Sequence, residues 1–137
     1  MIAKFYDRQD ASNPFNGSLV ASQRDVEAIL DGIENREPFF CELVGDNGYS
    51  LLVGVGSQSG CVQYSRNDGT PPYFMARLNR FQADRSESTQ DYVEFLIADT
   101  MSPIPTRYCL PMDSVKSISA HFCETGERSS SFAWEEI

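Results

Sequence analysis

Two stretches of the chain carry hydrophobic residues at the three- and four-residue spacing of an amphipathic helix. The first follows Ser22, whose hydroxyl can cap a helix. The second follows Pro111, a residue that favours the first turn, and Gly126 suits the position after the last turn. The pattern therefore predicts helices over about 22–33 and 112–124. Their buried stripes would be Val26, Ile29, Leu30 and Ile33 in the first helix, and Met112, Val115, Ile118 and Phe122 in the second.

Between and beyond these helices, short runs rich in β-branched and aromatic residues are separated by tight polar turns. Sequential strands of this kind favour antiparallel pairing. The most apolar run, 49–55, is expected to be a central strand covered on both faces. Two prolines make 99–106 a predicted loop, because proline cannot donate to a sheet ladder. A sheet of about six strands is expected, drawn from the runs 39–44, 49–55, 61–65, 73–76, 92–97, 107–110 and 131–137.

The order of these elements predicts a single α+β domain over residues 1–137, with a mainly antiparallel sheet packed by the two helices. The length of 137 residues is usual for one domain. Residues 1–20 are polar and contain two asparagine-based turn signals, which favours either a loose arm or a first short strand. Residues 78–90 are the most polar stretch and are expected to form an exposed loop.

The balance of charge separates this chain from nucleic-acid-binding domains. It has 20 acidic and 11 basic side chains, which gives a net charge of −9. Phosphate contacts need clustered lysine and arginine, so no direct nucleic-acid partner is expected, whereas a basic protein partner would suit the charge. Residues 91–137 hold eight acids and three bases, and thus −5 of the −9. The alternative is that the charge only keeps a small domain dispersed.

The first residues, MIAKFYDRQDASNPF, lack the apolar stretch of a secretory signal. No apolar run approaches the roughly 20 residues that a membrane-spanning helix needs. The protein is therefore expected to be cytoplasmic, with no membrane partner and with reduced thiols. None of the cysteines forms the closely spaced pair typical of a zinc site. The four predicted structural thiols are Cys41, Cys61, Cys109 and Cys123.

The sequence carries no catalytic or cofactor signature. Gly54, Gly56 and Gly60 superficially match a dinucleotide-binding loop, but a strand-like run follows them, so a hairpin turn is expected. His121 is the only histidine, and on a helix it would point to a different side from Cys123. No esterase, metalloprotease or Walker motif is present. We therefore expect no enzyme, no catalytic residue, no metal and no cofactor.

Three stretches of the chain resemble the immunity proteins that accompany deaminase toxins in bacterial polymorphic toxin systems. They are SQRDVEAILDGI, LLVGVGSQSGCVQYSRNDG and LPMDSVKSISAHFCETGERSSSFAWEEI. In the last, a helix that begins at Leu-Pro leads through a phenylalanine and a TGxR turn to a strand with tryptophan. The resemblance spans most of residues 20–137.

The resemblance implies a non-catalytic inhibitor that binds a cognate toxin and protects the producing cell in interbacterial competition. Deaminase toxins of this kind use a zinc-activated water on a flipped or single-stranded base. Their clefts must be basic to hold phosphates, and an acidic inhibitor would reach such a cleft quickly. Two other functions stay open. One is a small-ligand-binding or regulatory domain with a deep apolar pocket, and the other is an unrecognised hydrolase using His121 or Cys123.

The charge pattern also predicts where a partner would bind. Acidic residues gather around the run 92–97, and aromatic side chains interleaved with them could anchor an interface. The predicted partner-binding residues are Asp84, Glu87, Asp91, Glu94 and Asp99, with Tyr64, Tyr92 and Tyr108 as aromatic candidates.

Overall fold

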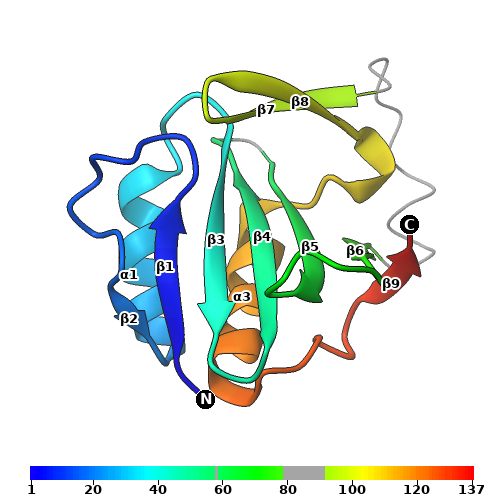
Figure 1. The fold of residues 1–137 in the computed structure, drawn as a ribbon. Helices are drawn as coiled ribbons and strands as arrows, with labels where there is room; N and C mark the ends of the chain where they lie inside the picture. Colours follow the sequence, from blue (N-terminus) through cyan, green and yellow to red (C-terminus); the bar gives the residue numbers. More distant parts are fainter. Residues whose placement is uncertain (58, 79–91) are drawn as a thin grey trace.

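Strands are the main secondary structure of this fold, which a computed structural model describes for residues 1–57, 59–78 and 92–137. Within those residues, nine strands form one sheet and two α-helices lie against it (Figure 1). The predicted α+β class is confirmed, although the sheet has nine strands in the described residues alone rather than about six. The loop predicted over 78–90 lies, after its first residue, outside the described residues. The strands are β1 (Ala3–Asp7), β2 (Leu19–Val20), β3 (Phe39–Gly45), β4 (Tyr49–Val55), β5 (Cys61–Arg66), β6 (Phe74–Arg77), β7 (Tyr92–Ile97), β8 (Thr100–Pro105) and β9 (Ala133–Glu136); the helices are α1 (Gln23–Ile33), α3 (Met112–Thr125) and a short 3-10 turn, η1 (Thr106–Tyr108).

The main path of the sheet has the order β2-β1-β3-β4-β5-β6-β9. Strands β3 to β6 follow one another along the chain and pair antiparallel, as predicted, with β4 in the centre. The hairpin of β7 and β8 branches from the start of β3, where Leu96 pairs in parallel with Phe39. Strand β9 follows α3 and pairs with β6, which places the C-terminus at one edge of the sheet.

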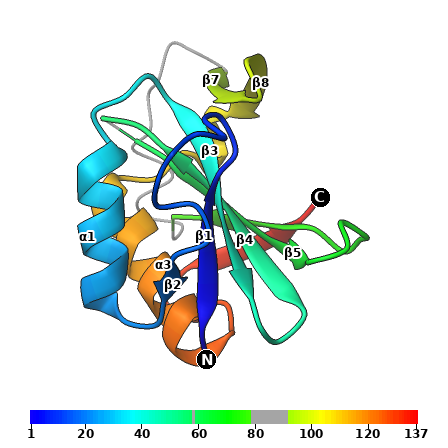
Figure 2. The ribbon, with the colours of Figure 1, turned by 60° about the vertical axis from the view of Figure 1, so that its left-hand side comes forward.

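Both helices cover the same face of the sheet (Figure 2). Helix α1 is capped as predicted, since Ser22 Oγ accepts a hydrogen bond of 3.2 Å from the Asp25 backbone N–H. Helix α3 ends as predicted at Gly126, whose φ of +78° is left-handed. Within the described residues, no helix combines the length and the apolar character needed to cross a membrane. The predicted stripes face inward: Val26, Leu30, Ile33, Met112, Val115, Ile118 and Phe122 are buried, and Ile29 packs half-buried beside them.

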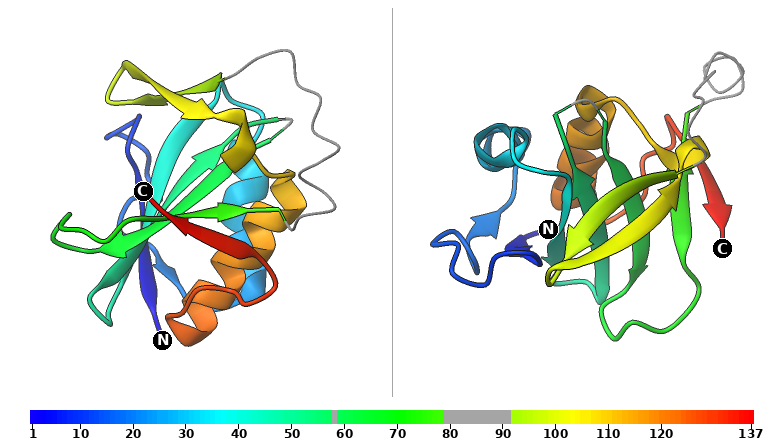
Figure 3. Two further views of the ribbon diagram at one scale, coloured as in Figure 1. Left: turned by 90° about the vertical axis from the view of Figure 1, so that its right-hand side faces the viewer. Right: turned by 90° about the horizontal axis from the view of Figure 1, so that it is seen from above.

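A second group of buried side chains lies on the face of the sheet opposite to the helices. Figure 3 shows the β7–β8 hairpin and the two helices on opposite sides of the central strands. Phe95 of the hairpin packs on Phe40 of β3, with ring centroids 5.4 Å apart. A Cβ at Gly54 would lie 3.0 Å from the Phe95 ring, so glycine allows this close approach. The second core consists of Phe40, Cys61, Met75, Phe95 and Tyr108.

The loop predicted over 99–106 is wrong, because β8 runs through most of it. Among the described residues, β8 pairs only with β7 and is therefore an edge strand. Pro103 and Pro105 lie two residues apart, so both nitrogens lie on the same edge of the strand. Proline is tolerated where that edge faces away from the ladder. The prolines thus limit further pairing without preventing the strand.

The strand predicted over 107–110 is also wrong. Residues Thr106–Tyr108 form the 3-10 turn η1 instead. Leu110 makes an isolated bridge with Gly60, in which each backbone N–H donates to the carbonyl of the other at 2.8 Å. The turn places the Tyr108 ring in the second core, and this position is fixed by distant residues rather than by the local sequence pattern.

The N-terminal segment begins with strand β1, which is one of the two alternatives expected for residues 1–20. Ala3 and Phe5 are fully buried where β1 lies between β2 and β3. The buried Asp7 carboxylate accepts hydrogen bonds from Arg36 Nη1 at 2.6 Å and from Asn13 Nδ2 at 3.0 Å. These contacts join the segment to the connection between α1 and β3, so residues 1–20 belong to the body of the fold.

The backbone conformation of the turn between β7 and β8 leads us to expect that one substitution there stabilises the protein. Ala98 and Asp99 both have positive φ, 47° and 64°, as a two-residue hairpin turn requires. Alanine is strained in this conformation, whereas asparagine tolerates it. Ala98→Asn is therefore expected to raise the free energy of unfolding by about 0.5–1 kcal/mol in urea titrations. Ala98→Val is the matched control and should lower it; an equal or less stable Ala98→Asn variant would contradict the argument.

Candidate functional site

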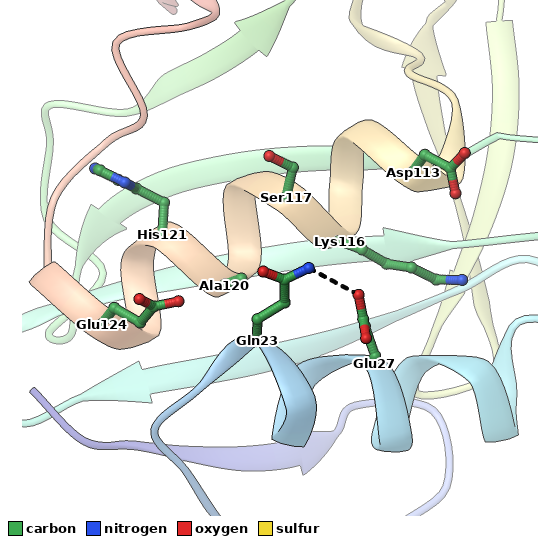
Figure 4. Close-up of a pocket in the computed structure, with 8 residues that line it drawn as sticks. All are labelled: Gln23, Glu27, Asp113, Lys116, Ser117, Ala120, His121 and Glu124. Carbon is green, nitrogen blue, oxygen red and sulfur yellow. Dashed lines mark hydrogen bonds between the residues drawn. The ribbon is translucent and has the colours of Figure 1, made fainter.

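A solvent-open groove of about 430 Å³ runs between α1 and α3 on the outer surface of the helical layer. Figure 4 shows side chains from both helices lining it. Gln23 Nε2 donates to Glu27 Oε1 at 2.9 Å across one turn of α1. Three carboxylates, one lysine and one histidine belong to the lining, so the groove is polar and acidic. The lining residues are Gln23, Glu27, Asp113, Lys116, Ser117, Ala120, His121 and Glu124.

The lysine of this groove is held by two further acidic side chains of the first helix and its end. Lys116 Nζ lies 2.6 Å from Asp31 Oδ1 and 2.8 Å from Glu34 Oε2. These hydrogen bonds raise the pKa of Lys116 to about 12. Because its charge is matched within this cluster, Lys116 does not offset the carboxylates of Glu27, Asp113 and Glu124. The groove therefore presents net negative charge.

The β7–β8 hairpin presents a second exposed surface, and it carries three of the predicted partner-binding residues. Tyr92 is 57% exposed, and Glu94 lies exposed on the same side of β7. Asp99 lies in the hairpin turn, where its carboxylate accepts a hydrogen bond of 2.6 Å from Gln9 Nε2. The structure thus brings Tyr92 and Glu94 together, and it engages Asp99 with the N-terminal segment. The predicted residues Asp84, Glu87 and Asp91 lie outside the described residues.

The other two predicted aromatic residues do not join this surface. Tyr108 is 3% exposed and packs in the second core, so its ring is not available to a partner. Tyr64 is half-buried, stacks on Tyr49 with ring centroids 5.0 Å apart, and meets the edge of Phe122. Its position joins the sheet to α3. Both rings were predicted to lie at the surface because acidic residues are near them in the sequence. Charge near a residue in the sequence carries no information on its burial.

Two exposed residues of the hairpin, Met101 and Pro103, are not among the residues that the charge pattern predicts. Met101, which is 46% exposed, and Pro103 lie beside Leu96 and Glu94 in the register of β7 and β8. The two prolines favour a loop, so the alternation of exposed and half-buried residues along this segment was not expected. The spacing of Met101, Pro103 and Pro105 at every second residue was the available signal, since alternate residues of a strand share a face.

The acidic groove and the exposed hairpin are surfaces suited to a protein partner, and comparison with known families gives the class of partner. A family model described as "Immunity protein Imm1" matches residues 16–136. The chain belongs to the Imm1 family. Among curated proteins, no match to the chain was found. The resemblance to immunity proteins is therefore confirmed, and the family match does not specify the chemistry of the toxin.

The cysteines of this Imm1 protein are poorly suited to nucleophilic chemistry. All four are free, and Cys41, Cys61 and Cys123 are buried. Burial raises the pKa of the Cys41, Cys61 and Cys109 thiols and raises the pKa of Cys123 to about 12. A thiol with a raised pKa stays protonated at neutral pH and is a weak nucleophile.

The alternative function, a small-ligand-binding domain, requires a deep apolar pocket. An apolar gap lined by Val20, Val26, Ile29, Leu30 and Leu43 measures about 10 Å³. A drug-sized ligand needs about 300–1,000 Å³. In the part of the chain that the structure describes, no group of three histidine, cysteine or acidic side chains is placed to hold a metal ion. Open hollows of about 430 Å³ and 290 Å³ lie at the groove and beside the hairpin, the second lined by Tyr92, Pro105, Thr106 and Arg107.

Proposed function

We propose that this Imm1 protein binds and inhibits a cognate toxin that deaminates nucleic-acid bases, and that it does so in the cytoplasm of the cell that makes both. The family match over residues 16–136 carries the immunity role. The proposal that the toxin is a deaminase is supported by the likeness of three stretches of the chain to immunity proteins found beside such toxins. An immunity protein acts by binding, which favours a non-enzymatic role for this chain.

The electrostatics of the protein support this partner. The net charge is −9, and the groove between α1 and α3 concentrates carboxylates on one face. An enzyme that acts on nucleic acid needs a basic cleft to hold phosphates. The opposite charges of the two proteins would speed their encounter and let the inhibitor compete with the nucleic acid. The proposal includes no direct nucleic-acid partner and no membrane partner.

The deciding experiment uses the gene beside this one. If that gene encodes an exported protein, its C-terminal domain is purified and tested for deamination of single-stranded DNA and RNA. We expect deamination to stop when the Imm1 protein is present in equimolar amount, and cells that express both to grow. A neighbouring domain that the protein neutralises but that does not deaminate would refute the deaminase. A neighbouring gene that encodes no toxin would refute the proposed partner.

The proposed electrostatic encounter has a kinetic signature. Between about 0.05 M and 0.5 M salt, the association rate should fall by roughly tenfold or more, because salt screens charges more than a few ångströms apart. The dissociation rate should change much less, since it depends on short-range contacts. Stopped-flow or surface-based kinetics with the purified toxin domain measures both rates. An association rate that is indifferent to salt would contradict the electrostatic part of the proposal.

A further inference from the structure

The outward side of the β7–β8 hairpin forms a continuous patch of side chains, which we call the hairpin face. The strand register places Tyr92 opposite Pro105, Glu94 opposite Pro103 and Leu96 opposite Met101. Paired residues of an antiparallel ladder project to the same side, so all six share one face. Five of them are uncharged. The hairpin face consists of Tyr92, Glu94, Leu96, Met101, Pro103 and Pro105, of which Leu96 and Pro105 are half-buried and Leu96 also packs against the larger core.

The hairpin face is supported on a fixed base. Phe95, on the other side of β7, is fully buried in the second core, and Val93 packs against the same cluster. At the turn, the Ala98 backbone N–H donates to the Arg8 carbonyl at 2.9 Å, and the Asp99 N–H donates to Gln9 Oε1 at 2.8 Å. A surface held along β7 and at the turn loses little conformational entropy when a partner binds. The face is therefore preorganised.

The centre of the hairpin face carries a carboxylate, Glu94, that no cation of the described residues matches. Glu94 is exposed between Tyr92 and Leu96 along β7 and beside Pro103 of β8. Among the described residues, no ion pair involves Glu94, whereas Arg8 pairs with Glu42 and Arg77 with Glu135. Tyrosine and methionine are enriched in protein interfaces, and a carboxylate that becomes buried among such side chains needs a cationic partner. A complementary surface would offer one lysine or arginine side chain between apolar groups.

Two other occupants fit this face poorly. A β-strand added to the free edge of β8 would lack two backbone donors, because Pro103 and Pro105 have no N–H. A second copy of the chain would bind through a two-fold axis, since dimer interfaces of this kind are self-complementary. An axis near the centre of the patch would bring two Glu94 carboxylates together, and like charges oppose such a contact. A basic partner protein has neither problem.

We propose that the hairpin face is the surface through which this protein docks on its toxin, at a site where the toxin presents a lysine or arginine side chain between apolar groups. This inference rests on the proposed function, because its occupant is the toxin that the function requires. It places the principal contact on the hairpin and leaves the acidic groove between α1 and α3 with the longer-range steering of the encounter.

The test compares two single charge reversals that change the net charge equally. Glu94→Lys lies in the hairpin face, and Glu124→Lys lies in the groove. With the purified domain encoded beside this gene as the probe, calorimetry should show that Glu94→Lys raises the Kd by at least about 100-fold and Glu124→Lys by no more than about threefold. The double variant Tyr92→Ala, Met101→Ala should raise the Kd by at least about tenfold. Circular dichroism and thermal melts check that each variant is folded, and Glu94→Gln replaces Glu94→Lys if the latter does not fold.

The outcomes separate this inference from the function on which it rests. A wild-type protein that neither binds nor protects against the domain would refute the proposed function. If the wild type binds and the Kd of Glu94→Lys is no more affected than that of Glu124→Lys, the function stands and the docking surface is wrong. A larger loss in Glu124→Lys would assign docking to the groove and overturn the inference. A homodimer that the Tyr92→Ala, Met101→Ala variant dissociates would assign the face to a second copy, which also overturns it.

Discussion

Replacing Phe95 with alanine is expected to lower the free energy of unfolding by about 3–5 kcal/mol, the usual cost of removing a buried phenyl ring. The Phe95 ring is fully buried, lies 5.4 Å from the Phe40 ring between centroids, and rests against the backbone at Gly54. Gly54 has no side chain and therefore allows the ring to approach closely. Loss of the Phe95 ring leaves a cavity that neighbouring side chains cannot readily fill. Urea titration of the wild type and the variant gives the difference directly.

The same substitution should weaken toxin binding, although Phe95 points away from the hairpin face. Without this anchor the hairpin is less fixed, and binding must then order it. The larger core on the helical side does not include Phe95, so the variant should stay folded at low temperature. Phe15→Ala is the matched control, because the Phe15 ring is 57% exposed; its stability should change by no more than about 0.5 kcal/mol. If the folded Phe95→Ala variant binds the toxin with unchanged affinity, the hairpin does not need this anchor for binding, and the prediction is contradicted.

The elements that depend on local pattern were the ones that the sequence predicted well. Helix α1 was expected over about 22–33 and is found at Gln23–Ile33, because the apolar spacing and the Ser22 cap act within a few residues of one another. Strand β4 was expected over 49–55 and has those bounds. Its apolar composition reflects its central place, which a single run of residues can reveal.

The elements that depend on distant partners were predicted poorly. Strand β8 exists because it pairs with β7 at an edge where proline is tolerated, and the prolines alone indicated a loop. Strand β1 was one of two alternatives for residues 1–20, and distant partners decide it: Leu43 lies opposite Phe5, and Arg36 lies beside Asp7. The residues of the candidate surface show the same contrast between local pattern and distant contacts. Alternation along β7 correctly put Tyr92 and Glu94 on one side, whereas the burial of Tyr108 follows from the hairpin folding over the sheet.

The ion pair of Asp7 and Arg36 should make the stability of the protein depend on acid pH. The Asp7 carboxylate is buried, while the Arg36 side chain is 35% exposed. Burial raises the pKa of Asp7, but the hydrogen bonds from Arg36, Asn13 and the backbone of Asp10 and Gln9 outweigh it and hold that pKa below its usual value of 3.8. A depressed pKa means that the charged form is preferred in the folded protein, so its stabilisation is present above the ordinary aspartate pKa and is lost as the pH falls through the folded value.

Asp7→Asn is accordingly expected to lower the free energy of unfolding at pH 7 by about 3 kcal/mol, the lower end of the cost of breaking a buried pair, since Arg36 can regain solvent. The difference between wild type and variant should shrink as the pH falls below about 4, where the wild-type carboxylate in the unfolded chain becomes protonated. Urea titrations at pH 7, 5, 4 and 3 give this profile. Glu42→Gln is the matched control: it removes the carboxylate of the more exposed Arg8–Glu42 pair, and it should cost no more than about 1 kcal/mol. A difference between Asp7→Asn and wild type that stays constant from pH 7 to 3 would show that the Asp7 contact stabilises the fold without its charge, because the loss on protonation is what links the ion pair to pH.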